Sequence, residues 1–171
     1  MPYEVILVDD ASTDSTGVIL TRYREHERVR VFTRQTNGGI GAAANEGVNQ
    51  SQGRYVVRVD ADDYVSEHFL QVLVLALADH ESPRAARCDY LTVDASGNFL
   101  QRQNANAHPI ACGILFDRDA LLQIGNYDHA LNLGEDTDLE RRFSEHYEIA
   151  HIPIALYRYR QHDGNTSGGH S

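Results

Sequence analysis

The first half of the chain alternates between short apolar runs and segments with helical spacing. The run Val5–Val8 is continuous, β-branched and ended by acidic residues, which is typical of a strand buried on both faces of a parallel sheet. The same patterns predict strands at Val29–Thr33 and Tyr55–Val59, each preceded by a helix, the second of which spans Ile40–Gln50. This alternation predicts an α/β fold with helices covering the sheet and ligands bound beyond the carboxyl ends of the strands.

The second half of the chain is less regular. We expect a helix capped by Ser66, a hairpin, two short helices and a final extended segment interrupted by Pro153. In order, these elements are the helix Phe69–Ala78, the hairpin of Tyr90–Val93 with Phe99–Leu100, the helices Asp117–Ile124 and Asp136–His146, and the segment His151–Tyr159.

The amino-acid composition excludes several classes of protein. The chain has 171 residues, with 15 basic and 25 acidic side chains and a net charge of −10, so we expect one domain that does not bind nucleic acid. Two distant cysteines argue against a disulfide scaffold or a zinc site and favour a reduced compartment. The longest apolar stretch is far shorter than the ~20 residues that span a bilayer. With no signal-peptide pattern at Met1, we expect a cytoplasmic protein.

Acidic residues follow two of the predicted strands directly. Asp9 and Asp10 end the first strand, and Asp60, Asp62 and Asp63 end the third. Because the carboxyl ends of parallel strands share one edge of a sheet, the two groups are expected to converge there, where carboxylates suit a hard divalent cation. A well-capped polar turn is the alternative explanation for an isolated Asp-x-Asp.

Two later segments carry further candidate chemistry. Glu135, Asp136 and Asp138 begin a predicted helix, where a carboxylate can cap free N–H groups or serve as a general base. His162 stands outside any apolar pattern, so it is either a surface residue or a metal ligand. Spacing alone does not choose between these roles.

Taken together, these segments resemble the inverting family-2 glycosyltransferases of the GT-A fold, a Rossmann-like sheet flanked by helices. The similarity extends over nearly the whole chain in ordered blocks. These blocks are Val5–Asp14, Asn37–Gly39 with Ala43–Gly47, Gly53–Asp63, Ala111–Asp128, Gly134–Asp136 and Tyr159–Ser167.

The resemblance implies how the donor is bound. Asp9 and Asp10 would contact the base and ribose of a nucleotide-sugar, such as a UDP-, GDP- or dTDP-sugar. Asp60 would contact the ribose, and Asp62 would hold Mn²⁺ or Mg²⁺ on the diphosphate with help from His162. The cation would stabilise charge on the departing nucleoside diphosphate.

The resemblance also implies the acceptor chemistry. Asp136 would be the base that deprotonates the acceptor hydroxyl, with Glu135 beside the nucleotide-sugar. The acceptor would be a glycan, a lipid-linked sugar or another hydroxyl in bacterial envelope or polysaccharide synthesis, made at the inner face of the membrane by peripheral association. We expect one catalytic domain, with residues 1–63 as its nucleotide-binding half and 64–171 as its acceptor-side half.

The chain departs from the family pattern in three places. One is Ala44, where many relatives place an Arg near the donor, so donor affinity is open to question. Nothing ahead of Val5 matches the family's first strand and helix, which would take about 25–30 residues, so we expect an N-terminally truncated domain whose Val5–Val8 strand has an open edge. A homodimer through that edge is one consequence. Ala11 stands where Gly is commoner, a change we expect to be harmless.

Two rival functions remain at this point. A truncated, non-catalytic relative would bind nucleotide weakly or associate through its open sheet edge. A different metal-dependent phosphoryl or nucleotidyl transferase would also use Asp-x-Asp, but it would leave Asp136 and His162 without a role.

Overall fold

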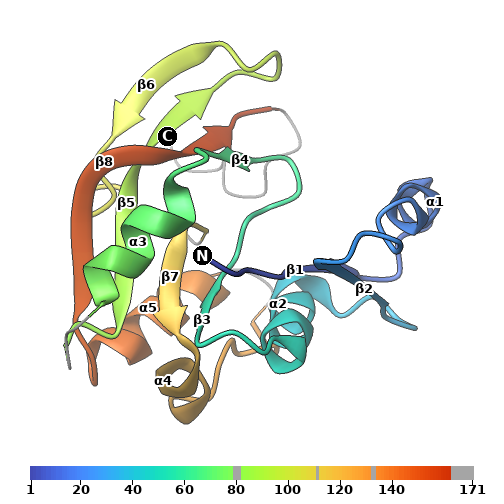
Figure 1. The fold of residues 1–171 in the computed structure, drawn as a ribbon, viewed down its shortest axis with the longest axis horizontal. Coiled ribbons are helices and arrows are strands. Elements are labelled where there is room, and N and C mark those ends of the chain that lie inside the picture. The colour runs from blue at the N-terminus through green and yellow to red at the C-terminus, as the bar shows by residue number, and fades with distance from the viewer. Residues whose placement is uncertain (79–81, 111, 132–133, 163–171) are drawn as a thin grey trace. The chain divides into compact units, whose positions relative to one another are not determined.

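The computed structural model of the protein describes residues 1–78, 82–110, 112–131 and 134–162. The chain forms two compact units, each built from two segments (Figure 1). Unit 1 comprises Met1–Val56 and Phe116–His146, and unit 2 comprises Val57–Leu115 and Tyr147–Ser171.

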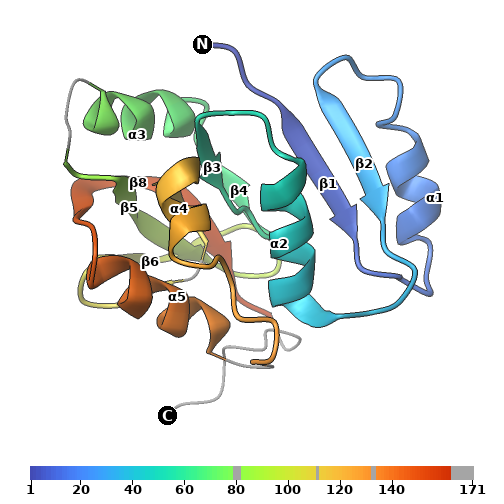
Figure 2. The ribbon, with the colours of Figure 1, turned by 90° about the horizontal axis from the view of Figure 1, so that it is seen from below.

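Unit 1 contains a small parallel sheet with helices alongside. The strands β1 (Val5–Asp9) and β2 (Val29–Thr33) pair in register from Val5 opposite Val29 to Asp9 opposite Thr33. Figure 2 shows the two strands side by side, with α1 (Thr16–Thr21) next to β2 and α2 (Gly39–Gln50) next to β1. α2 contacts β1, and a Cβ on Gly47 would lie 3.7 Å from the Val8 side chain, at ordinary van der Waals distance.

Two short helices complete the described part of unit 1. In α4 (Arg118–Gln123), the Asp117 side chain caps the helix by accepting a hydrogen bond from the Ala120 N–H at 3.1 Å. In α5 (Glu135–Ser144), Leu139 and Phe143 lie one turn apart and are both buried. The Phe143 ring packs edge-on against Phe116 with centroids 4.9 Å apart.

A second, six-stranded sheet has the strand order β3-β7-β5-β8-β4, with β6 paired to β5. β5 runs parallel to β8, whereas β4 against β8 and β6 against β5 are antiparallel. Apolar residues of α3 (Phe69–Leu77) pack against β5 and β8. The strands are β3 (Tyr55–Val57), β4 (Tyr64–Val65), β5 (Ala85–Val93), β6 (Phe99–Gln103), β7 (Ile114–Asp117) and β8 (Ile149–Arg160).

A buried ionic cluster joins the strands of unit 2. The Asp89 side chain is almost fully buried and accepts hydrogen bonds from His151 at 2.8 Å, Arg102 at 3.0 Å and the Ala105 N–H at 3.2 Å. Burial raises the pKa of Asp89, but these hydrogen bonds outweigh it and leave the pKa below its ordinary value. The β5–β8 register shifts on both sides of Asp89, next to Pro153 of β8, which has no N–H for the ladder.

Most predicted elements are confirmed, but the first three strands do not share one sheet. β1 and β2 pair as predicted, whereas β3 belongs to the six-stranded sheet. Within the described residues, β1 pairs with β2 alone, in line with the open edge that we expected.

Two local predictions are wrong. The N-cap of α3 is His68, because the Ser66 hydroxyl accepts a hydrogen bond from the His68 N–H, ahead of the helix. β7 and the first half of β5 were also missed. Both strands are buried on both faces and so do not alternate. In addition, β7 is only four residues long, and Arg87 and Asp89 interrupt the apolar run of β5.

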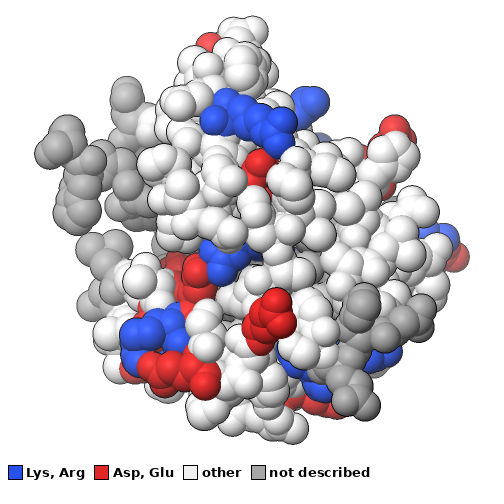
Figure 3. Space-filling view, turned by 90° about the vertical axis from the view of Figure 1, so that its left-hand side faces the viewer, with Lys and Arg blue, Asp and Glu red and all other residues white. Residues whose placement is uncertain are grey.

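None of the described helices combines the length and the apolar character needed to cross a membrane. On the face drawn in Figure 3, acidic and basic side chains lie next to one another between wide areas of uncharged residues. Ion pairs also form within α5, where Asp138 contacts Arg141 at 3.0 Å and Arg142 at 2.7 Å.

Candidate active site

Asp9 is held at the end of β1 by a tight turn. Its side chain accepts a hydrogen bond from the Ser12 N–H at 3.0 Å and is almost fully buried. Ala11, inside that turn, has a φ of 59°, a left-handed conformation in which a Cβ costs about 1–2 kcal/mol. The expectation that Ala in place of Gly is harmless here is therefore wrong, because the turn needs the conformation that glycine adopts without strain.

Asp10 ties the end of β1 to the start of α2. Its carboxylate forms an ion pair with Arg34 at 2.8 Å and accepts hydrogen bonds from the N–H groups of Gly38 at 3.0 Å and Gly39 at 2.7 Å. The Asp10 carbonyl also accepts a hydrogen bond from the Asn37 side chain at 3.1 Å. Asp10 thereby fixes the Asn37–Gly39 turn.

The loop after β3 carries the Asp-x-Asp pair in unit 2. Arg58 donates two hydrogen bonds to the Asp60 carboxylate, from Nε at 2.7 Å and from Nη2 at 3.2 Å. Asp62 Oδ2 lies 2.8 Å from His162 Nε2. Both side chains of that second pair are partly exposed, at 43% for Asp62 and 34% for His162, so a ligand can reach them.

Asp63, in the same loop, is half-buried. It accepts hydrogen bonds from the Tyr157 hydroxyl at 2.7 Å and the Arg160 N–H at 2.8 Å, and it contacts the Cys112 sulfur at 3.7 Å. Burial raises the pKa of Asp63 above its ordinary value, against the opposing effect of the Arg160 and Tyr157 hydrogen bonds. Burial likewise raises the pKa values of Tyr157 and Cys112, so both keep their protons at neutral pH.

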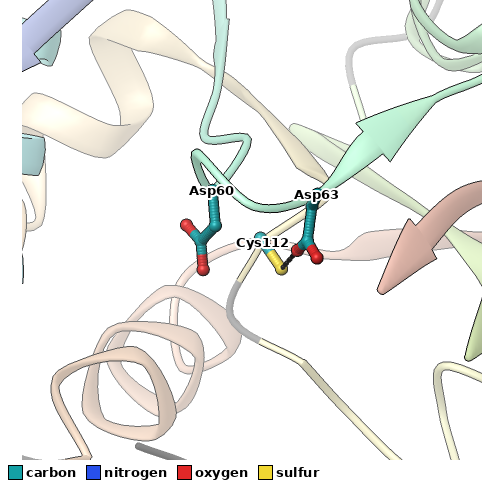
Figure 4. A group of neighbouring side chains, drawn as sticks. All are labelled: Asp60, Asp63 and Cys112. Carbon is teal, nitrogen blue, oxygen red and sulfur yellow. Dashed lines mark hydrogen bonds between the residues drawn. The ribbon is translucent and has the colours of Figure 1, made fainter. Parts of the chain in front are cut away.

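Two groups of donor atoms could hold a metal ion. Figure 4 shows Asp60, Asp63 and Cys112 together, with ligand atoms within 4.8 Å of one another. That group fits a hard cation poorly, because sulfur is a soft ligand and both Asp63 oxygens already accept hydrogen bonds. The accessible oxygen and imidazole donors of Asp62 and His162 fit Mn²⁺ or Mg²⁺ better.

Glu135 and Asp136 begin α5 in unit 1. The chain enters the helix through Gly134 in a left-handed conformation, with a φ of 80°. Glu135 is buried and Asp136 is half-buried. Asp138, one turn further on, is engaged by Arg141 and Arg142; hydrogen bonding to Arg142 lowers its pKa. Asp138 therefore has a structural role on the helix surface.

The structure brings Asp62 and His162 together, as the sequence predicts, and carries Asp60 on the same loop. Asp9, Asp10, Glu135 and Asp136 belong to unit 1, while Asp60, Asp62 and His162 belong to unit 2. That all of these residues form one site stays a prediction.

Sequence reasoning missed the residues that hold the Asp60–Asp63 loop in place. Arg58 could have been noticed as a charge within the apolar segment Tyr55–Val59. Tyr157 and Arg160 gave no comparable signal, because they are 94 and 97 positions from Asp63 in the sequence.

Comparisons with known proteins agree with the fold and the motifs. The sequence profile described as "Glycosyl transferase family 2" matches residues 1–86. The glycosyltransferase GlyG of Streptococcus pneumoniae is 34% identical over 56% of this chain and 32% of its own length. Chondroitin synthase of Escherichia coli is 29% identical over 96% of this chain and 25% of its own length.

Among solved structures, S. aureus TarS 1-349 in complex with UDP-GlcNAc superposes with a TM-score of 0.81 at 22% identity, over 96% of this chain and 52% of that one. The chain thus spans about a third or less of these two curated relatives and about half of the solved structure. The profile match covers half of the chain and includes both acidic strand ends. The chain belongs to glycosyl transferase family 2 and has the GT-A fold.

Proposed function

We propose that this protein transfers a sugar from a nucleotide-sugar to an acceptor hydroxyl, with a divalent cation and with inversion at the anomeric carbon. The observation that carries the proposal is the contact of Asp62 with His162 at 2.8 Å on the accessible side of the Asp-x-Asp loop. Family membership supports the reaction class.

UDP is the proposed nucleotide, because TarS, a protein of the same fold, is described in complex with UDP and with UDP-GlcNAc. Asp9 and Asp10 would contact the base and ribose, and Asp60 the ribose. Relatives such as chondroitin synthase support a glycan acceptor in polysaccharide synthesis. Residues 1–63 as the nucleotide-binding half, with 64–171 on the acceptor side, complete this proposal.

Asp62 and His162 would hold Mn²⁺ or Mg²⁺. The bound cation would supply electrostatic stabilisation of the departing diphosphate. The Asp62 carboxylate gives an oxygen ligand, and His162 gives a neutral imidazole nitrogen once Nε2 has lost its proton. The two atoms lie 2.8 Å apart at the protein surface, close enough to share one cation.

Asp136 would accept the proton of the acceptor hydroxyl. As that oxygen attacks the anomeric carbon, the bond from this carbon to the diphosphate breaks on the opposite face, and the configuration inverts. Glu135, buried beside Asp136 at the start of α5, would contact the nucleotide-sugar. A carboxylate in this role typically contributes about 10²–10⁴ in rate.

The test is a calorimetric titration of UDP into the protein with and without Mn²⁺, followed by donor turnover. We expect UDP to bind more tightly with Mn²⁺, and Asp62→Asn to remove that difference. Equal UDP affinity in both conditions would contradict metal dependence, and cleavage of UDP-GlcNAc without inversion would contradict the mechanism.

A second candidate function follows from β1, which pairs with β2 alone within the described residues and whose Val5 is 38% exposed. An open strand edge favours association, so a homodimer through β1 with weak nucleotide binding and no turnover is the alternative. Light scattering distinguishes it, because a monomer that turns over donor would exclude it.

A further inference from the structure

One hydroxyl of β8 holds both ends of the Asp60–Asp63 loop. The Tyr157 oxygen accepts a hydrogen bond from the Asp60 N–H at 3.3 Å and donates one to Asp63 at 2.7 Å. A phenolic hydroxyl has one proton to donate and lone pairs to accept, so both contacts form at once. Because the Tyr157 side chain is 1% exposed, water cannot replace either contact.

The tyrosine ring itself has little freedom. It packs edge-on against Phe69 with centroids 6.0 Å apart. Its other neighbour is the backbone of Gly113, where a Cβ would come within 3.0 Å of the ring and where φ is +80°. Packing therefore fixes the Tyr157 side chain in one position, with its hydroxyl against the loop.

A second attachment lies at the next residues of the same strand. Arg160 donates its backbone N–H to Asp63 at 2.8 Å and its side-chain Nε to the Asp62 carbonyl at 2.9 Å. The antiparallel pairing of Tyr64 with Arg158 sets this register. The loop carrying Asp62 is therefore fastened to the strand that leads to His162.

We propose that Tyr157 and Asp63 are positioning residues, which hold the Asp60–Asp62 loop so that Asp62 and His162 can bind the metal–nucleotide complex together. This inference rests on the proposed function for its ligand. Tyr157 and Asp63 do not touch the ligand; they act through the backbone of Asp60 and Asp62. Groups that orient metal ligands in this way typically affect metal affinity or activity by about 10–100-fold.

The test compares two single-atom deletions. Tyr157→Phe removes the hydroxyl and keeps the ring. Tyr90→Phe is the matched control, since Tyr90 is buried in the same unit and its hydroxyl donates to the His108 carbonyl at 3.1 Å, outside the loop. Tyr157→Phe loses two hydrogen bonds and Tyr90→Phe loses one. Both variants should therefore lose stability, Tyr157→Phe more than Tyr90→Phe, but Tyr157→Phe alone should disturb the loop.

Two readouts separate this inference from the proposed function. Hydrogen exchange of the peptide covering residues 58–64 needs no ligand, and it should be faster in Tyr157→Phe than in the parent or in Tyr90→Phe. Titration of UDP with Mn²⁺ should show affinity about tenfold lower in Tyr157→Phe than in the parent, and Tyr90→Phe should keep the parent affinity. If the parent shows no metal-dependent UDP binding, the proposed function fails and hydrogen exchange still decides the role of Tyr157.

Unchanged exchange of the loop in Tyr157→Phe, or the same loss of Mn²⁺–UDP affinity in both variants, would overturn the inference. Cys112→Ala tests whether Asp63 binds the metal directly with its neighbours, since the ligand atoms of Asp60, Asp63 and Cys112 lie within 4.8 Å of one another. We expect Cys112→Ala to keep the parent Mn²⁺ affinity. A tenfold loss would make this cluster the metal site and Asp63 a ligand.

Discussion

Replacing Arg58 by Met should destabilise the fold while it strengthens the binding of free Mn²⁺. Arg58 meets Asp60 in a two-point contact at 2.7 and 3.2 Å. The two side chains are 15% and 26% exposed, so solvent screens this pair less than a surface ion pair. Methionine keeps most of the apolar stem of Arg58, so the change isolates the guanidinium.

The expected loss of stability follows from that geometry. Two unit charges about 4 Å apart attract by about 4 kcal/mol at an effective dielectric constant of ~20, and the desolvation of both groups offsets part of this. Hydrogen bonds to charged groups contribute about 1.5–3 kcal/mol net. We therefore expect Arg58→Met to lower the free energy of unfolding by about 1.5–3 kcal/mol.

The metal effect has the opposite sign. Removing a positive charge next to Asp60 leaves the Asp60–Asp63 loop more negative, so Mn²⁺ without nucleotide should bind more tightly. Urea unfolding measures the first effect and Mn²⁺ titration the second. Arg141→Met is the control, because Arg141 is 60% exposed and should cost less than about 1 kcal/mol. A change within about 0.5 kcal/mol of the parent, or weaker Mn²⁺ binding, would refute the electrostatic reasoning.

Four further changes have defined outcomes. Asp62→Asn should abolish the gain in UDP affinity on adding Mn²⁺ with an unchanged melting temperature, as calorimetry and a thermal melt will check. Asp136→Asn should keep UDP binding and cut donor turnover by about 10²–10⁴; turnover at the parent rate would make Asp136 a helix cap. Because the pKa of Asp89 is lowered from 3.8 in the folded state, its ionised form stabilises the fold above that pH, and this contribution is lost as pH falls through the folded pKa. The free energy of unfolding, measured with urea between pH 7 and pH 3, should therefore decline less steeply in Asp89→Asn than in the parent as the pH falls. Ala11→Gly should raise the free energy of unfolding by about 0.5–1 kcal/mol, since relief of left-handed strain exceeds the entropy cost of glycine.

The strands and helices of the first half could be predicted because their signals are local. A β-branched run such as Val5–Val8 favours a strand, and the alanines of α2 favour a helix whatever lies around them. The expected burial of that strand on both faces is wrong, because Val5 is exposed and the next three residues are half-buried. The exception is Ala11, whose left-handed φ of 59° is set by the turn that Asp9 closes rather than by its own preference.

Strands that carry buried charges were harder to predict. The first half of β5 contains Arg87 and Asp89, which interrupt its apolar run although both are buried. The burial of Asp89 is tolerated because partners from other strands satisfy it, as His151 does across 62 positions of sequence. No local pattern can report a partner at that separation.

The candidate site likewise contains some residues that a sequence motif predicts and others that only the fold brings together. Asp62 and His162 lie 100 positions apart, and only the resemblance to a family with both motifs links them in the sequence. Tyr157 and Asp63 are linked by the β4–β8 register, which sets Tyr64 opposite Arg158 and so brings Asp63 to the end of β8. Because a shift of that register by one residue would turn the Tyr157 side chain to the other face of the sheet, strand pairing fixes the loop as much as its own sequence does. A sequence motif therefore predicts the proposed catalytic and metal-binding carboxylates, whereas the contacts that hold them in place depend on the fold.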